Sequence, residues 1–398
     1  MTTEDGRGLT KVNTPTSDIR HPTSIARASL LKGVQRIVVK LGTRVLTTLD
    51  HALDMDLIQR IADQMAILRA RDIQLAIVSS GAIGAGMGRL GLRFRPRSLP
   101  QLQAAAAIGQ NQLMYGYEQA FGQYDIPIGQ VLLTADDILN NRARYLNVRS
   151  TFTALFEAGA VPIVNENDSV ATDEIKLGDN DTLSAHVTNL VGADLLIILT
   201  DLDGLYSADP RQNRASTLIP MVQRITPEIE ALAGSSGSEV AVGGMRTKIE
   251  AARIVTGSGE MMLIANGKKD SLIDILDGKD IGTLFLAQTD KRASRKRWIA
   301  FNMDGKGTVE VDAGAARALV ERGRSLLASG ITAVHGMFQL GDMIGILDPP
   351  GREIARGLTN YSTEELNKIR GRKSSEFEKI LGYRSYDEVV HRDNLVLM

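Results

Sequence analysis

Several short polar or glycine-rich segments of this sequence carry groups suited to binding phosphate. Lys40 lies near the end of the otherwise apolar run Arg36–Leu41, and Gly42 follows that run. A charged side chain on a buried strand is costly unless it is paired or meets an anionic ligand. The alternative for Lys40 is a lysine at the chain end of a strand that reaches solvent. Gly42 and the glycine-rich Ser79–Gly88 loop supply backbone N–H groups that can cradle anionic oxygens.

Three further segments have the same character. The segments Asn165–Asp168 and Lys176–Asp181 contain far more hydrogen-bonding groups than one helix cap or turn requires, so we interpret them as ligand-binding. The glycine-rich Val242–Lys248 segment leads into a predicted helix and places Lys248 in its first turn. A lysine there opposes the helix dipole, which favours a role at a phosphate over simple surface charge.

Other phosphate, metal and redox signatures fail on spacing or composition. Gly86–Gly91 matches G-x-G-x-x-G but begins several residues after its strand, without the acidic partner of a dinucleotide site. No P-loop motif occurs, and Asp201–Gly204 lacks the spacing of a calcium loop. The five histidines are scattered and there is no cysteine, which excludes disulfides, thiolate zinc sites and cysteine nucleophiles.

Short apolar runs alternate with segments of helical periodicity. Strands are predicted at Arg36–Leu41, Gln74–Ser79, Pro127–Thr134, Val161–Asn165, Leu195–Thr200 and Met262–Ala265. Helices are predicted at Asp54–Ala70, Gln101–Tyr124, Leu146–Ala158, Asp181–Val191 and Met245–Thr256. Nearly all-apolar strands separated by helices predict an α/β fold, with a mainly parallel sheet sandwiched by helices. The polar segments follow strand ends, so we expect them to converge on the carboxyl edge, where such sheets bind ligands.

Composition and length define the domains. The chain has 398 residues, 43% hydrophobic and 23% charged, with a net charge of −1, so it predicts two or three folded domains without a global attraction to nucleic acid. No apolar run is long enough for a transmembrane helix. We expect a flexible extension at 1–33, an α/β domain at 34–290, a linker with the start of the tail at 291–304 and a small β-rich domain at 305–388.

Five motifs, in this order and spacing, carry a family resemblance: VVKLGT, VSSGAIGAG, VPIVNENDSVATDEIKLGDNDTLSA, LTDLDGLYSADPR and GGMRTK. Together they resemble the amino-acid kinase family, and within it the members that act on glutamate. The segment from Val311 to Leu347, with one predicted helix at Ala313–Arg322, resembles a PUA domain. The resemblance covers about residues 34–398 and implies that ATP and an amino acid bind side by side along the carboxyl edge of the sheet.

The resemblance also implies an activity. The family members that this sequence resembles phosphorylate the side-chain carboxylate of L-glutamate with ATP and Mg²⁺, giving L-glutamyl 5-phosphate. This reaction is the first step of proline biosynthesis and is subject to feedback inhibition by proline. The resemblance further implies a cytoplasmic dimer or tetramer and a functional association with glutamyl-phosphate reductase. A carboxylate acceptor is ionised at neutral pH and needs no general base, which is consistent with the absence of an evident His–carboxylate pair near the motifs.

Residue roles follow from the same resemblance. Lys40, Lys248 and Asp181 would be catalytic, with Asp181 orienting both lysines, and Mg²⁺ would be held mainly by the phosphates of ATP, without a protein metal site. The residues implied to hold glutamate are Ser80, Asp168 and Asn180. Those implied to contact ATP are Lys40, Gly42, Thr200, Asp201, Val242, Gly243, Gly244, Met245, Arg246, Thr247 and Lys248. Arg44 and Arg246 depart from the small residues common in the family.

Two alternatives stay open at the level of sequence. Another kinase of the family could act on N-acetylglutamate, aspartate or a nucleoside monophosphate, although the pair Asp168 and Asn180 favours a free amino acid with an ammonium group. An RNA-binding or RNA-modifying protein is the other alternative, because PUA domains often occur in such proteins. The net charge of −1 argues against it, and the basic cluster Lys291–Arg297 is interpreted as a solvated linker.

Overall fold

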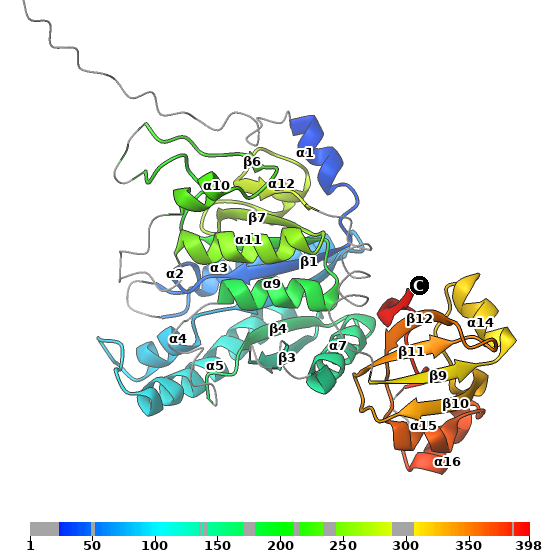
Figure 1. Cartoon of the computed structure of the whole chain (residues 1–398). Helices are drawn as coiled ribbons and strands as arrows, with labels where there is room; N and C mark the ends of the chain where they lie inside the picture. Colours follow the sequence, from blue (N-terminus) through cyan, green and yellow to red (C-terminus); the bar gives the residue numbers. More distant parts are fainter. Residues whose placement is uncertain are drawn as a thin grey trace, which may run out of the picture.

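The computed structural model describes residues 24–48, 52–134, 137–138, 142–169, 180–210, 213, 215–233, 244–288, 306–383 and 386–398. These residues form an N-terminal α/β domain and a smaller β-rich C-terminal domain (Figure 1). Among them, no helix combines the length and the apolar character needed to cross a bilayer.

The N-terminal domain is built on one sheet. Its strands are β1 (Arg36–Leu41), β2 (Gln74–Ser79), β3 (Ile128–Leu133), β4 (Val161–Glu166), β5 (Leu195–Thr200), β6 (Met221–Val222), β7 (Met261–Asn266) and β8 (Thr283–Phe285). They are ordered β3-β4-β2-β1-β5-β7-β8-β6, and all neighbours are parallel except β7 and β8. The mainly parallel sheet predicted from the sequence is therefore confirmed.

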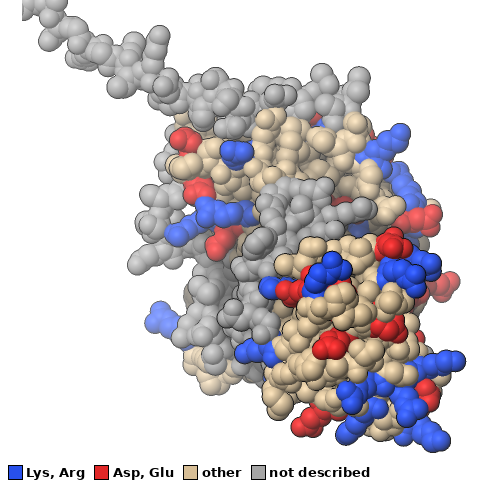
Figure 2. Space-filling model, turned by 45° about the vertical axis from the view of Figure 1, so that its right-hand side comes forward, with Lys and Arg blue, Asp and Glu red and all other residues tan. Residues whose placement is uncertain are grey.

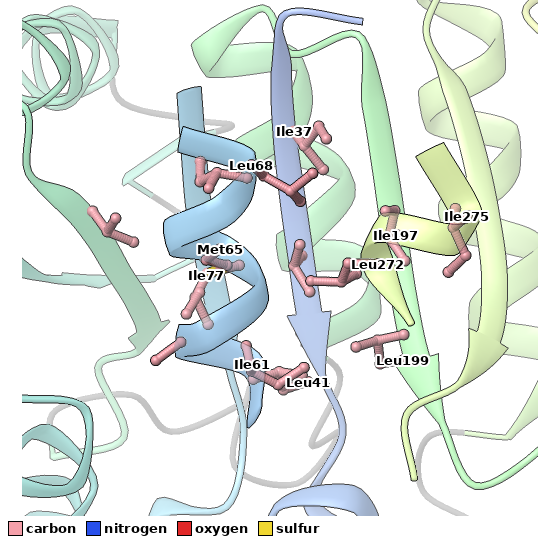
Figure 3. Close-up of a cluster of buried hydrophobic side chains, with 14 of the residues drawn as sticks. Ile37, Leu41, Ile61, Met65, Leu68, Ile77, Ile197, Leu199, Leu272 and Ile275 are labelled. Carbon is pink, nitrogen blue, oxygen red and sulfur yellow. The ribbon is translucent and has the colours of Figure 1, made fainter. Parts of the chain in front are cut away.

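Helices cover both faces of this sheet, as the buried strands require. The helices are α1 (Ser24–Leu31), α2 (Thr43–Leu46), α3 (Met55–Arg69), α4 (Ala82–Arg89), α5 (Leu99–Gly122), α7 (Arg142–Glu157), α9 (Asn180–Val191), α10 (Pro227–Leu232), α11 (Met245–Gly257) and α12 (Leu272–Leu276). One core cluster packs α3, α5 and α12 against one face of the sheet, and a second packs α7, α9 and α11 against the other. Figure 3 shows side chains of α3 and α12 in the first cluster.

The segment predicted as an open loop after β2 is mostly helical, which corrects the sequence-based interpretation. Helix α4 begins at Ala82, after Gly81 with φ 93°. A Cβ on Gly86 would lie 1.8 Å from the carbonyl oxygen of Ala105, and one on Gly109 would lie 1.7 Å from that of Ala82. Glycine at both positions therefore lets α4 and α5 pack with their backbones in contact, which local sequence patterns do not reveal.

An ordered helix also occurs where a flexible extension was predicted. Helix α1 lies within residues 1–33, and the side chain of Arg27 on it is fully buried and donates a hydrogen bond to the carbonyl oxygen of Ile281. Gly278 faces α1 so closely that a Cβ there would lie 2.4 Å from the Cα of Ala28. Residues 1–23 lie outside the described residues.

The C-terminal domain has a sheet ordered β10-β9-β11-β12-β13 and its own core cluster. Its elements are β9 (Gly307–Val311), α14 (Ala313–Val320), β10 (Ile331–Gly336), β11 (Met343–Leu347), β12 (Glu353–Leu358), α15 (Thr363–Ile369), α16 (Phe377–Leu381) and β13 (Leu395–Leu397). Strand β13 pairs with β12, so the domain reaches beyond the boundary expected at residue 388. The expected linker Lys291–Arg297 lies outside the described residues.

The two domains meet through α7. Leu146 on this helix packs with three buried residues of the second sheet: Met343, Leu358 and Val396. The hydroxyl of Tyr386 donates to the side chain of Asn147 at 3.3 Å, beside this apolar contact. Basic and acidic side chains are interspersed on the face of the C-terminal domain shown in Figure 2.

Candidate active site

The carboxyl ends of four neighbouring strands meet at one edge of the first sheet. Strands β4, β2, β1 and β5 are contiguous and parallel, and the residues at or just beyond their ends are Asn165, Ser80, Gly42 and Thr200. The convergence predicted from the sequence is therefore confirmed. Open parallel sheets bind ligands at this edge, so it is the candidate site.

Helices α9 and α11 cover one face of the sheet at β1 (Figure 1). The alternation of side chains along β1 aims Lys40 at that face. Successive side chains of a strand point to opposite faces. Val39 and Leu41 belong to the first core cluster, whereas Val38 belongs to the second. Lys40 shares the face of Val38, and its ammonium group meets Asp181 in the first turn of α9 there.

Two lysines meet at one carboxylate in this corner. The Nζ atom of Lys40 lies 2.7 Å from Oδ1 of Asp181, and that of Lys248 lies 3.0 Å from Oδ2. The hydroxyl of Thr247 donates to the same Oδ2 at 2.7 Å. The structure thus brings together the three residues predicted to be catalytic, and we call Lys40, Asp181 and Lys248 the lysine–aspartate cluster. Their roles in catalysis stay a prediction.

The cluster is almost closed to solvent. The side chains of Lys40 and Lys248 are 9% and 5% exposed, and that of Asp181 is fully buried. Burial by itself would raise the pKa of Asp181, but the charges of Lys40 and Lys248 and the hydrogen bond from Thr247 outweigh it and lower the pKa to about 2. Asp181 is therefore a carboxylate throughout the neutral range.

The charges of the cluster suit a phosphate ligand. Because two ammonium groups share one carboxylate, the three side chains carry one excess positive charge. A phosphoryl group arriving at this edge of the sheet would meet ammonium groups from two separate elements, β1 and α11, and such groups neutralise its negative charge.

The segments predicted to contact the nucleotide lie only partly within the described residues. Gly244, Met245, Arg246 and Thr247 lie at the start of α11, with Gly244 as its N-cap, but Val242 and Gly243 lie outside the described residues. The N–H of Gly42 donates to the carbonyl oxygen of Leu199 at 3.2 Å. That N–H is already used by the fold, so the prediction that it cradles an anionic oxygen is not supported.

Arg44 engages a residue predicted to bind the nucleotide. Its Nη1 atom lies 3.1 Å from Oδ2 of Asp201, and the hydroxyl of Thr200 donates to Oδ1 of Asp201 at 3.1 Å. Partial burial raises the pKa of Asp201, and the contacts with Arg44 and Thr200 more than offset this, so the pKa is lowered. Arg44, which departs from the family pattern, thus forms an ion pair that links the segments following β1 and β5.

The residues predicted to hold the amino acid lie on the other side of the cluster. Asn180, the first residue of α9, donates from Nδ2 to the carbonyl oxygen of Ser79 at 2.8 Å and to Oγ of Ser80 at 3.0 Å. A third acceptor, Oδ1 of Asn165, lies 3.0 Å from the same Nδ2, whose two hydrogens are shared among the three contacts. Asp168 lies just beyond the end of β4, at the same edge. Ser80 and Asn180 are therefore in direct contact.

Helix α5 contributes two residues that the sequence analysis missed. The side-chain oxygen of Gln110 accepts from Nδ2 of Asn165 at 2.8 Å, and the hydroxyl of Tyr117 lies 2.9 Å from Oγ of Ser79. Tyr117 is fully buried, and burial raises its pKa, so it is a neutral hydrogen-bonding group. Their only sequence signal is a polar side chain on the buried face of an alanine-rich helix.

The described residues contain no group of three His, Asp or Glu side chains that could hold a metal ion. The donors at the candidate site are instead ammonium, amide and hydroxyl groups around one carboxylate. Such donors bind an anionic, oxygen-rich ligand and neutralise its charge. The arrangement therefore suits the binding and transfer of a phosphoryl group.

Comparison with known proteins decides the family. The model of the "Amino acid kinase family" matches residues 35–266, which is more than half of the chain. The chain belongs to the amino acid kinase family. A PUA domain model matches residues 307–381, as expected from the resemblance of the tail. The chain is thus a kinase of this family with a C-terminal PUA domain.

Two named relatives match nearly the whole chain. A protein of Trichlorobacter lovleyi named "Glutamate 5-kinase" is 52% identical over 94% of this chain and 99% of its own length. A protein of Moorella thermoacetica with the same name is 49% identical over 92% of this chain and 97% of its own length. Among solved structures, the isopentenyl phosphate kinase of T. acidophilum matches with a TM-score of 0.44 and 20% identity, covering 63% of this chain and 99% of its own.

Proposed function

We propose that this kinase transfers the γ-phosphoryl group of ATP to the side-chain carboxylate of L-glutamate, forming L-glutamyl 5-phosphate and ADP. The observation that carries the proposal is the lysine–aspartate cluster next to the contact between Asn180 and Ser80. The cluster suits a phosphoryl group, and the neighbouring amide and hydroxyl groups suit a small polar acceptor. The names of the relatives at about 50% identity support glutamate as that acceptor.

The chemistry requires alignment and charge neutralisation. A carboxylate oxygen of glutamate attacks the γ-phosphorus, and the bond from that phosphorus to the bridging oxygen breaks, so that ADP leaves with the electron pair. The acceptor is ionised at neutral pH, with a pKa of about 4.3, and no proton has to be removed. Negative charge spreads over the transferred group, and preorganised cations stabilise it there.

Each member of the cluster has a distinct role in this proposal. Lys40 and Lys248 approach the transferred phosphoryl group from β1 and from α11, while Asp181 holds both ammonium groups in place. Thr247 fixes the second oxygen of that carboxylate. Mg²⁺ would supply further charge neutralisation, and oxygen atoms of the nucleotide and water would be its main ligands, since it dehydrates reluctantly.

The acceptor would occupy the neighbouring side of the edge. Ser80, Asp168 and Asn180 would bind glutamate, with Asp168 offering a carboxylate to its ammonium group. Thr200, Asp201 and the start of α11 would contact ATP. We also propose that the reaction begins proline biosynthesis in the cytoplasm, that proline inhibits it at or near the glutamate site, and that the enzyme works as a dimer or tetramer in association with glutamyl-phosphate reductase.

A panel of acceptors tests this proposal. ADP release is measured with Mg²⁺ and ATP and with L-glutamate, L-aspartate, N-acetyl-L-glutamate or UMP, each with and without proline. We expect ADP release with L-glutamate well above that with the other acceptors, and a decrease when proline is added. Preferential turnover of N-acetyl-L-glutamate or UMP would overturn the choice of acceptor, and insensitivity to proline would overturn the proposed regulation.

A further inference from the structure

A chain of three side-chain amides connects helix α5 to the acceptor side of the candidate site. Nδ2 of Asn165 donates to Gln110 on α5, and Nδ2 of Asn180 donates to Oδ1 of Asn165. Asn165 is 2% exposed and Asn180 is 7% exposed. We call Gln110, Asn165 and Asn180 the amide relay.

Backbone groups fix the orientation of every amide in the relay. The N–H of Glu166 donates to Oδ1 of Asn165 at 2.9 Å, so the Nδ2 group of Asn165 must face Gln110. Gln110 must then turn its oxygen toward Asn165. The carbonyl oxygen of Ser79 can only accept, so the atom of Asn180 that faces it is Nδ2. No amide can flip without losing one of these hydrogen bonds.

Once these orientations are fixed, two polar atoms of the relay stay unused. Oδ1 of Asn180 and Nε2 of Gln110 are both buried and have no hydrogen-bond partner. A buried polar group without a partner is costly, and native proteins rarely keep one without a reason. One atom is an acceptor and the other is a donor, so the relay is complementary to a ligand that brings both kinds of group.

The close packing of α4 and α5 places Gln110 at this point. Gly109 precedes it in the sequence and touches the backbone at Ala82, in the first turn of α4. That turn directly follows Ser80, whose hydroxyl accepts from Asn180. The fold therefore brings a residue from the middle of α5 to the carboxyl ends of β2 and β4.

We propose that Gln110 is a positioning residue for the amino-acid acceptor. Through Asn165 it holds Asn180 so that Oδ1 faces outward from the relay to accept a hydrogen bond from the α-ammonium group of the substrate. The relay thereby selects a free α-amino acid over a dicarboxylate that lacks this group. The inference rests on the proposed function, because it assigns the recognition of the same acceptor.

The test compares L-glutamate with glutarate, which has the same two carboxylates and no ammonium group. The readout is the ratio of the two kcat/KM values, measured by ADP release in wild type and in Gln110→Met, which keeps the length of the side chain and removes both polar atoms. A hydrogen bond to a charged group contributes enough for about a tenfold change in affinity. We expect the ratio to fall about tenfold, through a higher KM for glutamate, with the KM for ATP unchanged.

Two further variants separate positioning from general loss of structure. Gln110→Glu keeps an oxygen for Asn165, so its ratio should stay within about threefold of wild type, even though its added charge raises the KM of both dicarboxylates. Gln112→Met, on the exposed face of the same helix, should match wild type. A lowered ratio in Gln110→Glu, or in Gln112→Met, would overturn the proposal.

The possible failures are distinguishable. If wild type turns over glutamate but Gln110→Met leaves the ratio unchanged, the positioning role is wrong and the proposed function stands. If wild type does not use glutamate, the proposed function is wrong and this inference falls with it. If Gln110→Met does not fold, the ratio for Gln110→Glu decides, because that variant keeps the hydrogen bond on which the inference depends.

Discussion

Replacing Asp181 with asparagine is the perturbation that bears most directly on the lysine–aspartate cluster. Asparagine has nearly the same shape and can still accept a hydrogen bond from Thr247. It removes the negative charge that Lys40 and Lys248 share at 2.7 Å and 3.0 Å. The substitution therefore changes the electrostatics of the cluster with little change in packing.

The structure gives the size of the expected effect. The pKa of Asp181 falls from 3.8 to about 2 on folding, and at 1.36 kcal/mol for each pH unit this contributes about 2 kcal/mol to the free energy of unfolding. Removing one partner from a buried charge pair costs about 3–5 kcal/mol. We therefore expect Asp181→Asn to lose about 2–5 kcal/mol near neutral pH, and to lose phosphoryl transfer as well, because the ammonium groups are no longer held.

The contribution of Asp181 to the free energy of unfolding should depend on pH in a definite direction. The pKa of Asp181 is lowered in the folded protein, so its contribution is fully present above about pH 4 and is lost as the pH falls from 3.8 toward 2. The difference in stability between wild type and Asp181→Asn should narrow over that range.

Urea unfolding midpoints, measured from about pH 7 down to the lowest pH at which wild type stays folded, test both points. The control is Asp277→Asn, which breaks an exposed ion pair with Arg71 and should cost less than about 1 kcal/mol. The reasoning is refuted if Asp181→Asn unfolds at the wild-type midpoint near neutral pH. It is also refuted if its difference from wild type widens as the pH falls.

The remaining predictions concern substrate, chemistry and modularity. Asp168→Ala should raise the KM for glutamate far more than that for ATP, and equal effects would argue against a direct contact. Lys248→Ala should lower kcat by about 10²–10³ with glutamate binding nearly intact, and Lys248→Arg should recover only part of this loss. As a control, Lys279→Ala, which removes an exposed lysine, should match wild type. A normal kcat in Lys248→Ala would assign the role to another cation. A chain ending at Gln288 should keep glutamate-dependent ATP turnover, because the cluster and the amide relay lie in the first domain. A folded but inactive truncation would contradict this.

Sequence patterns were sufficient to predict the bounds of several buried strands. β1, β2 and β5 have the predicted bounds, because a strand buried on both faces is a short apolar run with polar neighbours. The same patterns located the strand ends, and the order of the sheet then brought Lys40 and Ser80 to one edge. The ion pairs of Asp181 depend on how α9 and α11 pack on β1, which sequence alone does not specify.

The missed features have tertiary causes. The glycine-rich segment around Gly86 resembles a loop locally, but Gly86 on α4 and Gly109 on α5 are points where these two helices touch. Gln110 lies on a helix far in sequence from Asn165, so no local motif marks their contact. Strand β13 is only three residues long and is stabilised by pairing with β12, which explains why the C-terminal domain extends beyond its expected end.

The identity of the phosphorylated atom tests the central claim most directly. An acyl phosphate reacts with hydroxylamine, so the product of wild type with ATP, Mg²⁺ and L-glutamate can be trapped and its position of attachment determined by NMR. The lysine–aspartate cluster and the amide relay together predict the hydroxamate at the side-chain carboxyl group, in an amount equal to the ADP released. A hydroxamate at the α-carboxyl group, or ADP release without any hydroxamate, would contradict the account.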